Sequence, residues 1–302
     1  MMNELSEKIL KLKKEKNAII LAHLYQIPEV QEIADYVGDS YYLSQVARDA
    51  KEDLIIFCGV KFMAESAKVL SPDKTVILPA PNAGCPMADM AEVEDVEEMI
   101  KKYPDAFKVC YINSSYEVKA LCDASVTSSS ALNIMNNIPN KQILFLPDQN
   151  LGGYIAEFFP EKEFILWRGF CPTHHRITAE DVLNAKQEHP NVKVLAHPEC
   201  SKEVRELSDY LGSTSGIINY ATKCEDNEFI IATEEGVLHQ LQKKNPNKKF
   251  YFPEMMVCPN MKKTTLQDIY DALDGKREEV VLDEEIRQKA LTSLENMHKL
   301  GN

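Results

Sequence analysis

The chain has 302 residues, of which 44% are hydrophobic and 27% charged, and it carries a net charge of −13. That length allows two or three small units with separate cores. The acidic balance, without a basic stripe, excludes nucleic acid as an expected partner. No apolar run approaches the ~18 residues that cross a bilayer, so no membrane partner is expected either.

The predicted elements begin with an amphipathic helix over residues 1–17, which lacks the apolar region and cleavage site of a signal peptide. Three similar blocks follow, each with three short apolar, β-branched runs separated by helical stretches. The runs cover 18–21, 54–57 and 75–78, then 108–110, 143–146 and 164–167, then 192–195, 229–231 and 249–252. Short strands that alternate with helices indicate parallel sheets covered on both faces.

Each block ends in a loop with the dipeptide Cys-Pro, which occurs only at Cys85, Cys171 and Cys258. The separations are 86 and 87 residues (171 − 85 and 258 − 171). Such regular spacing identifies three internal repeats. We predict an α/β fold of three homologous three-layer αβα repeats around a pseudo-threefold axis, with the active site at the centre. The domains are 1–103 (N-terminal helix and repeat one), 104–190 (repeat two) and 191–302 (repeat three and C-terminal helices).

The opening segments of the repeats align without a gap, and chemically similar residues recur in five columns. The columns are His23, Tyr111 and His197; Tyr25, Asn113 and Glu199; Glu29, Glu117 and Glu203; Asp35, Asp123 and Asp209; and Ser40, Ser128 and Thr214. The alternative explanation for these recurring residues is that the repeats arose by duplication and that the columns have no function. In parallel α/β units, however, ligands bind outside the carboxyl ends of the strands. The residues of the first column stand at the end of the first predicted strand of each repeat, and the loop cysteines follow the third. Packing of the repeats around one axis would therefore bring both sets to one cavity.

Three equivalent thiolates match the symmetry of a 4Fe-4S cubane, whose threefold axis passes through one iron. Three thiolates would hold the other irons, and the axial iron would stay open as a Lewis acid. Zinc bound by these thiolates and His174 or His175 is the competing interpretation, although structural zinc normally uses closely spaced ligand pairs. Eight cysteines without an export signal indicate a reducing compartment. Cys58, Cys110 and Cys122 are interpreted as core thiols, and Cys200 and Cys224 are left unassigned.

Several motifs together resemble the quinolinate synthase family over nearly the whole chain. They are A-H-L-Y at 22–25, G-C-P at 84–86, C-Y-I-N at 110–113, C-P-T-H-H at 171–175, A-H-P-E-C at 196–200, G-S-T-S-G at 212–216 and V-C-P-N-M at 257–261. The resemblance implies a cytoplasmic enzyme of NAD biosynthesis. Such an enzyme condenses iminoaspartate with dihydroxyacetone phosphate to quinolinate, with release of phosphate and water. The enzyme that produces iminoaspartate is a candidate partner.

The resemblance also implies roles for particular residues. The 4Fe-4S ligands would be Cys85, Cys171 and Cys258. The catalytic residues would be Tyr25, Glu199, His23, His197 and Tyr111. The substrate-binding residues would be His23, Ser40, Tyr111, Ile112, Asn113, Ser128, His174, His197, Pro198, Glu199, Ser213, Thr214 and Lys223. Some members have further cysteines where this chain has Met261 and Thr264, so no thiol switch is expected there.

We predict that Tyr25 and Glu199 carry protons to and from the reacting substrates, since they share a column and would face one cavity. Burial would raise the pKa of the Glu199 carboxyl towards the operating pH. Asn113 cannot titrate and would only bind. The Ser/Thr column would anchor carboxylates or cap helices. His174, with Lys223, would meet the phosphate. The methionines at 87, 90, 255 and 256 would pack around the cluster. Two other classes stay open: another hydro-lyase with an open iron, and a non-catalytic cluster or zinc sensor.

Overall fold

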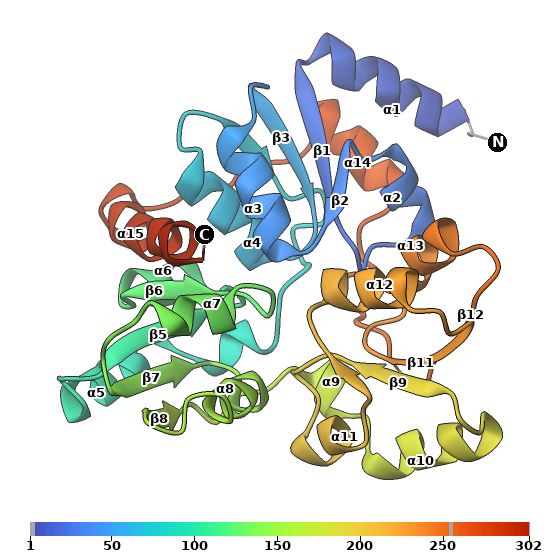
Figure 1. Cartoon of the computed structure of the whole chain (residues 1–302). Helices are drawn as coiled ribbons and strands as arrows, with labels where there is room; N and C mark the ends of the chain where they lie inside the picture. The colour runs from blue at the N-terminus through green and yellow to red at the C-terminus, as the bar shows by residue number, and fades with distance from the viewer. Residues whose placement is uncertain (1–3, 254–255, 302) are drawn as a thin grey trace.

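The computed structural model describes residues 4–253 and 256–301 and contains three separate parallel sheets in those ranges. Each sheet has four strands in an equivalent order: β2-β1-β3-β4, β6-β5-β7-β8 and β10-β9-β11-β12. Figure 1 shows each sheet in its own lobe, with the three lobes around the middle of the molecule. The predicted α/β class, with three repeated units, is therefore confirmed.

The strands are short and lie at equivalent places in the repeats. They are β1 (Ala18–His23), β2 (Tyr36–Gly38), β3 (Leu54–Cys58) and β4 (Thr75–Ile77); β5 (Phe107–Tyr111), β6 (Ala124–Val126), β7 (Gln142–Leu146) and β8 (Glu163–Leu166); and β9 (Lys193–Ala196), β10 (Tyr210–Leu211), β11 (Glu228–Ala232) and β12 (Lys249–Tyr251). The sequence predicted three strands per repeat. The fourth, β2, β6 or β10, has only two or three residues, too few to show an apolar pattern.

The helices connect and cover these strands. They are α1 (Glu4–Glu15), α2 (Pro28–Ile33), α3 (Ser40–Asp49), α4 (Lys61–Leu70), η1 (Ala88–Met90), α5 (Val93–Lys102), α6 (Tyr116–Ala120), α7 (Ala131–Asn136), α8 (Gln149–Ala156), α9 (Pro172–His175), α10 (Ala179–Glu188), α11 (Lys202–Glu206), α12 (Thr214–Lys223), α13 (Val237–Lys244), α14 (Leu266–Leu273) and α15 (Glu284–Leu300). None of those in the described part of the chain has both the length and the apolar character needed to cross a bilayer.

The N-terminal helix α1 confirms the predicted amphipathic segment, because its Ile9 is fully buried against the first sheet. The methionines at 87, 90, 255 and 256 were expected to pack around the cluster. Met87 and Met256 are both 1% exposed, but neither Met90 nor Met256 lines the central cavity described below. Met87 lines that cavity, whereas Met256 belongs to the core of the third repeat. Met255 lies outside the described residues.

The aspartate column holds the short strands in place. One carboxylate oxygen of Asp35, Asp123 and Asp209 accepts a backbone N–H of the first strand of its repeat, at 2.8 Å each time. The N–H of each aspartate donates back to the carbonyl of that same strand residue, at 2.9, 2.9 and 2.8 Å. The column is therefore explained by strand pairing and needs no ligand.

Asp209→Ala should lower the free energy of unfolding by about 1 kcal/mol, because the N–H of Val194 loses its side-chain acceptor at a partly exposed site. Urea unfolding followed by circular dichroism measures the change. Asp209→Asn keeps an acceptor oxygen and should retain most of the stability. Equal losses in both variants would show that the carboxylate acts in another way.

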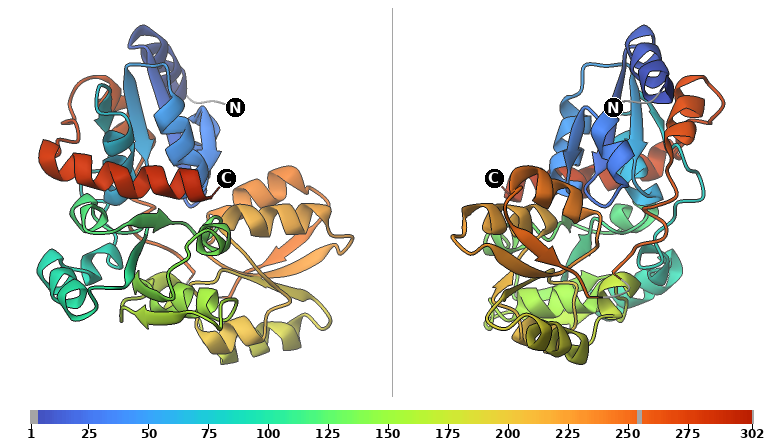
Figure 2. Two further views of the ribbon diagram at one scale, coloured as in Figure 1. Left: turned by 60° about the vertical axis from the view of Figure 1, so that its left-hand side comes forward. Right: turned by 90° about the vertical axis from the view of Figure 1, so that its right-hand side faces the viewer.

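The helix after each cysteine loop leaves its own repeat and packs on the next sheet. Val96 of α5 lies in one core with β5 and β7, and Val182 of α10 with β9 and β11. The helix after the third cysteine loop, α14, returns to the first repeat, where its Ile269 packs with β1 and β3. The predicted divisions after residues 103 and 190 thus separate α5 and α10 from the sheets that they cover. The last helix, α15, contacts α4 and α6 and lies along the first and second lobes (Figure 2).

Candidate active site

A cavity of about 240 Å³ is lined by residues from all three repeats. Its walls come from the loops after the strands, as the parallel sheets predict. The Cys-Pro loops contribute Cys85, Cys171 and Cys258. The structure therefore brings these three distant cysteines to one cavity.

Most of the predicted site residues line this cavity, and four do not. Those that line it are His23, Tyr25, Ser40, Tyr111, Asn113, Ser128, His174, His197, Glu199 and Thr214, besides the three cysteines. Ile112 and Pro198 are buried beside lining residues, and Ser213 caps α12. Lys223 is exposed at the far end of α12, so the structure does not bring it to the cavity.

The Ser/Thr column is free to face the cavity because the preceding residue does the capping. Asp39 accepts the N–H of Tyr42, and Ser213 accepts the N–H of Gly216. In the second repeat Thr127 accepts the N–H of Ser130 in the turn before α7, whose N-cap is Ser130 and has no side-chain cap bond. The expectation that Ser40, Ser128 and Thr214 themselves cap helices is therefore wrong. The hydroxyls of Ser128 and Thr214 instead contact His197 and Tyr25 in the cavity wall.

The two histidines of the first column sit in equivalent turns. The N–H of Tyr25 donates to His23 Nδ1 at 3.2 Å, and that of Glu199 to His197 Nδ1 at 3.3 Å. Burial lowers the pKa of each histidine to about 3, so both rings are neutral near pH 7. Since Nδ1 accepts, Nε2 carries the proton, and His197 Nε2 donates to Ser128 Oγ at 3.1 Å.

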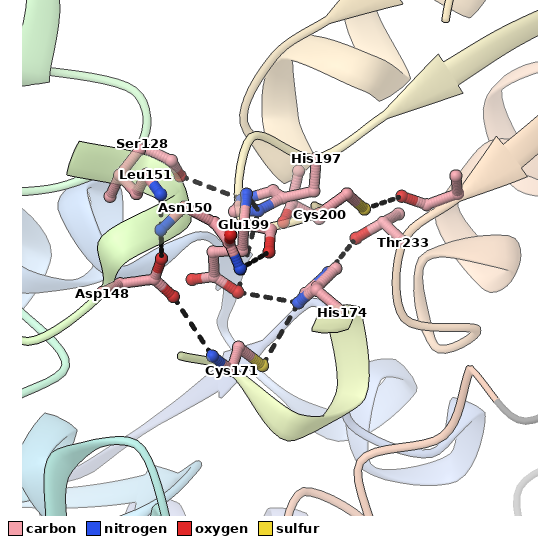
Figure 3. Close-up of polar contacts among 12 residues, drawn as sticks. Ser128, Asp148, Asn150, Leu151, Cys171, His174, His197, Glu199, Cys200 and Thr233 are labelled. Carbon is pink, nitrogen blue, oxygen red and sulfur yellow. Dashed lines mark hydrogen bonds and ion pairs between the residues drawn. The ribbon is translucent and has the colours of Figure 1, made fainter. Parts of the chain in front are cut away.

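A continuous chain of hydrogen bonds joins the two residues of the acid–base prediction. His174 Nδ1 donates to Glu199 Oε2 at 2.7 Å, and the hydroxyl of Tyr111 also donates to Glu199. His174 Nε2 lies 3.0 Å from Thr233 Oγ1, and this hydroxyl lies 2.9 Å from the Tyr25 hydroxyl. Figure 3 shows the part of this chain from Glu199 to Thr233. Tyr25 therefore reaches Glu199 through two intermediates, and the tyrosine directly beside Glu199 is Tyr111.

The prediction that burial raises the pKa of Glu199 towards the operating pH is wrong. Burial does oppose the charged form, but His197 and His174 and hydrogen bonds from His174 and Tyr111 lower the pKa to about 2. Near neutral pH the group is a carboxylate that accepts these bonds. Burial raises the pKa of Tyr25 well above its ordinary value, so this hydroxyl stays protonated.

Thr233 is a member of the site that the sequence did not reveal. It follows directly on β11, where the other repeats have Gly59 after β3 and Pro147 after β7. Only the third repeat has a hydroxyl at this position, so comparison of the repeats gives no signal for it. Its complete burial and its bonds to Tyr25 and His174 identify it.

The cavity cysteines have partners suited to a metal centre. Cys171 Sγ lies 3.3 Å from His174 Nδ1, and the ligand atoms of Cys171, His174 and Glu199 all lie within 4.8 Å of one another. Burial raises the pKa of the Cys85 thiol to about 12. A bound metal would favour the thiolate. In a cubane each thiolate binds a different iron, so three cysteines spread around one cavity fit that group.

The remaining cysteines play no part in the cavity wall. Cys58, Cys110 and Cys122 are buried in the cores, which confirms their interpretation as core thiols. Cys200 is also fully buried and donates to the carbonyl of Ala232 at 3.5 Å. Cys224 ends α12 near the surface.

Two polar groups of the cavity wall, the Asn113 amide oxygen and the Arg176 guanidinium, could bind a ligand. Asn113 Oδ1 is buried and accepts no hydrogen bond from any residue that the structure describes, a costly state that a ligand donor would relieve. Arg176 is exposed at the cavity and is the sole lysine or arginine among the described residues that line it. No ion pair or hydrogen bond within the described ranges holds its guanidinium, so this cation is available to an anion.

The α/β architecture and this cavity define an enzyme with a candidate metal centre built from cysteine, histidine and carboxylate groups. A family model described as "Quinolinate synthetase A protein" matches residues 7–299. The chain is 60% identical over 299 residues to the "Quinolinate synthase" of Clostridioides difficile, covering 99% of this chain and 98% of that protein. The identity to the "Quinolinate synthase" of Caldicellulosiruptor bescii is 56% over 298 residues, covering 98% of each. The chain therefore belongs to the quinolinate synthetase A family.

Proposed function

We propose that the chain condenses iminoaspartate with dihydroxyacetone phosphate to quinolinate, with release of phosphate and water. The observation that carries this proposal is the meeting of three Cys-Pro cysteines with the His-x-Tyr and His-x-Glu turns in one cavity. Membership of the family supports the same reaction. The cytoplasm as compartment and the iminoaspartate-producing enzyme as partner are parts of this proposal.

Cys85, Cys171 and Cys258 would hold a 4Fe-4S cluster at the cavity. When bound, the cluster supplies one iron without a protein ligand, which acts as a Lewis acid towards a substrate oxygen. Zinc is the second candidate, because Cys171, His174 and Glu199 could hold a single ion. That set would leave Cys85 and Cys258 unused, although both belong to the same repeated loop. This is why we favour the cluster.

The substrates are anions, and the wall offers them matching donors. The hydroxyls of Ser40, Ser128 and Thr214 come from equivalent positions of three repeats, so they surround a bound carboxylate from different sides. Asn113 supplies an amide to the same ligand. Arg176, and not Lys223, is the cation that would meet the phosphate, since only Arg176 lines the cavity.

Proton movement falls to the chain of groups between Tyr25 and Glu199. The Glu199 carboxylate would take a proton from the condensing substrates only transiently, through His174 or directly, because its low pKa favours giving the proton back. Tyr25, protonated and bonded to Thr214 and Thr233, is ready to give one to a departing hydroxyl. Both steps need a group at the cavity that exchanges protons, which the neutral amide of Asn113 cannot do.

Arg176→Ala should raise KM for dihydroxyacetone phosphate about tenfold and leave KM for iminoaspartate closer to the parent value. The physical reason is the loss of a charge-assisted bond to the phosphate. Since Arg176 is exposed, the difference should shrink as salt screens the charge. Steady-state kinetics at low and high ionic strength measure it, with Lys223→Ala as the matched control. An equal effect of the control variant would contradict the assignment.

The reaction itself is tested with anaerobic, iron- and sulfide-reconstituted protein. Iminoaspartate and dihydroxyacetone phosphate are supplied, and quinolinate and phosphate are measured together. Equal formation of both products supports the proposal. A protein that binds the cluster but forms no product would favour the alternative of a non-catalytic sensor. A protein that holds stoichiometric zinc and no iron would exclude the cluster.

A further inference from the structure

The residue two positions after the third strand of each sheet occupies an equivalent place beside a cysteine loop. These residues are Val60 after β3, Asp148 after β7 and Glu234 after β11. In each case the next residue, at position 61, 149 or 235, donates its N–H to the carbonyl two positions before the loop cysteine, at 2.8, 2.8 and 2.9 Å. A backbone hydrogen bond therefore links the segment after β3, β7 or β11 to the cysteine loop of the same repeat.

Two repeats add a side-chain bond to the cysteine itself. Asp148 Oδ2 accepts the backbone N–H of Cys171 at 3.2 Å, and Glu234 Oε1 accepts that of Cys258 at 3.0 Å. Figure 3 shows the first of these bonds. Both acids are 0% exposed. The first repeat has Val60 at this place, so Cys85 has no such acceptor there.

The second oxygen of each acid fixes the acid in its place. Asp148 Oδ1 accepts the N–H groups of Asn150 and Leu151, both at 2.8 Å, and so caps α8. Glu234 Oε2 accepts the N–H of Gly236 at 2.7 Å, and Lys262 lies 2.9 Å from Glu234 Oε1. Burial of a carboxylate is costly unless hydrogen bonds satisfy it. Helix capping would use only one oxygen of Asp148, so it does not explain the bond to Cys171.

We propose that Asp148 and Glu234 are positioning residues that fix the backbone of Cys171 and Cys258 and thereby direct two of the three thiols towards the cluster. Neither residue is a ligand. Each acts through the backbone N–H of a cysteine. The hydrogen bond fixes the orientation of that peptide group and prevents its N–H from donating elsewhere. This inference rests on the proposed cluster site. It assigns an asymmetry to that site, since the residue at the equivalent place beside the Cys85 loop is Val60, which has no carboxylate to accept the N–H of the cysteine.

The test follows release of iron from the reconstituted full chain to an excess of a ferrous chelator under anaerobic conditions. Asp148→Ser keeps a hydroxyl that can cap α8 but is too short to reach Cys171, and it should release iron about tenfold faster. Asp148→Asn keeps one acceptor oxygen, which can serve either Cys171 or the cap of α8 but not both, so its release rate should lie between those of the parent and Asp148→Ser. Glu234→Ala and Glu234→Gln form the same pair for Cys258.

Asp209→Ala is the matched control, because it removes a carboxylate that accepts a strand N–H away from the cavity. It should lower stability and leave iron release and the electron paramagnetic resonance signal of the reduced cluster unchanged. Parent-like release from Asp148→Ser and Glu234→Ala would overturn the inference. A parent chain that takes up no cluster would instead refute the proposed function, and this inference with it.

Discussion

Replacing Cys85, Cys171 or Cys258 by serine should remove most of the iron and abolish quinolinate formation. The parent protein, reconstituted without oxygen, should be brown and hold about four irons per chain, the composition of a cubane. Each thiolate would bind a different iron, so no neighbour can replace a missing one. Iron analysis and the visible absorption band measure the loss directly, without reference to turnover.

Cys224→Ser serves as the control for these variants, because Cys224 ends α12 outside the cavity wall. It should keep the parent iron content and activity. Full iron content in any of the three cavity variants would contradict the proposed ligand set. Loss of iron only in Cys171→Ser, together with bound zinc in the parent, would point to the single-ion site of Cys171, His174 and Glu199.

Glu199→Gln and Tyr25→Phe should each lower turnover about 10²–10⁴-fold, the usual effect of removing one acid–base group. Glutamine keeps the shape of Glu199 and can accept the bond from His174, but it cannot take up a proton. Phenylalanine removes the hydroxyl that lies 2.9 Å from both Thr214 and Thr233. Single-turnover formation of quinolinate, measured at matched iron content, separates this loss from poor binding.

Glu203→Gln is a suitable companion variant. Glu203 belongs to another repeated column, four residues beyond Glu199, but it is exposed on α11 and does not line the cavity. It should behave as the parent. Near-parent turnover of both Glu199→Gln and Tyr25→Phe would show that protons move by a different route.

The repeats made much of the fold predictable. Apolar runs located the first, third and fourth strands of each sheet, and the equivalent Cys-Pro loops indicated a shared cavity. The strands β2, β6 and β10 were missed because two or three residues carry no periodicity. Their registers depend on the aspartate column, whose role became visible only as bonds to the first strands.

The site was predicted less completely, because some of its members have no equivalent in the other repeats. Thr233 has no hydroxyl at the equivalent position of the other repeats, so no column marked it. Arg176 and Lys263 both stand five residues beyond a loop cysteine, but the first repeat has Met90 there and the match was missed. The pKa of Glu199 was predicted in the wrong direction, since burial was considered without the hydrogen bonds from His174 and Tyr111. Sequence spacing shows which residues recur, but not which polar partners surround a buried charge.

The exchange of helices between neighbouring repeats has a consequence for how the chain folds during synthesis. The first sheet is complete at Ile77, but α14, which covers it, begins 189 residues later (266 − 77). Until then a nascent chain exposes apolar side chains such as Ile20 and Ile56, and exposed apolar surface invites aggregation. The earliest part of the protein to be made is thus among the last to be finished. A ribosome that stalls before α14 leaves one face of the first sheet, covered until then only by α1 and α2, incompletely buried.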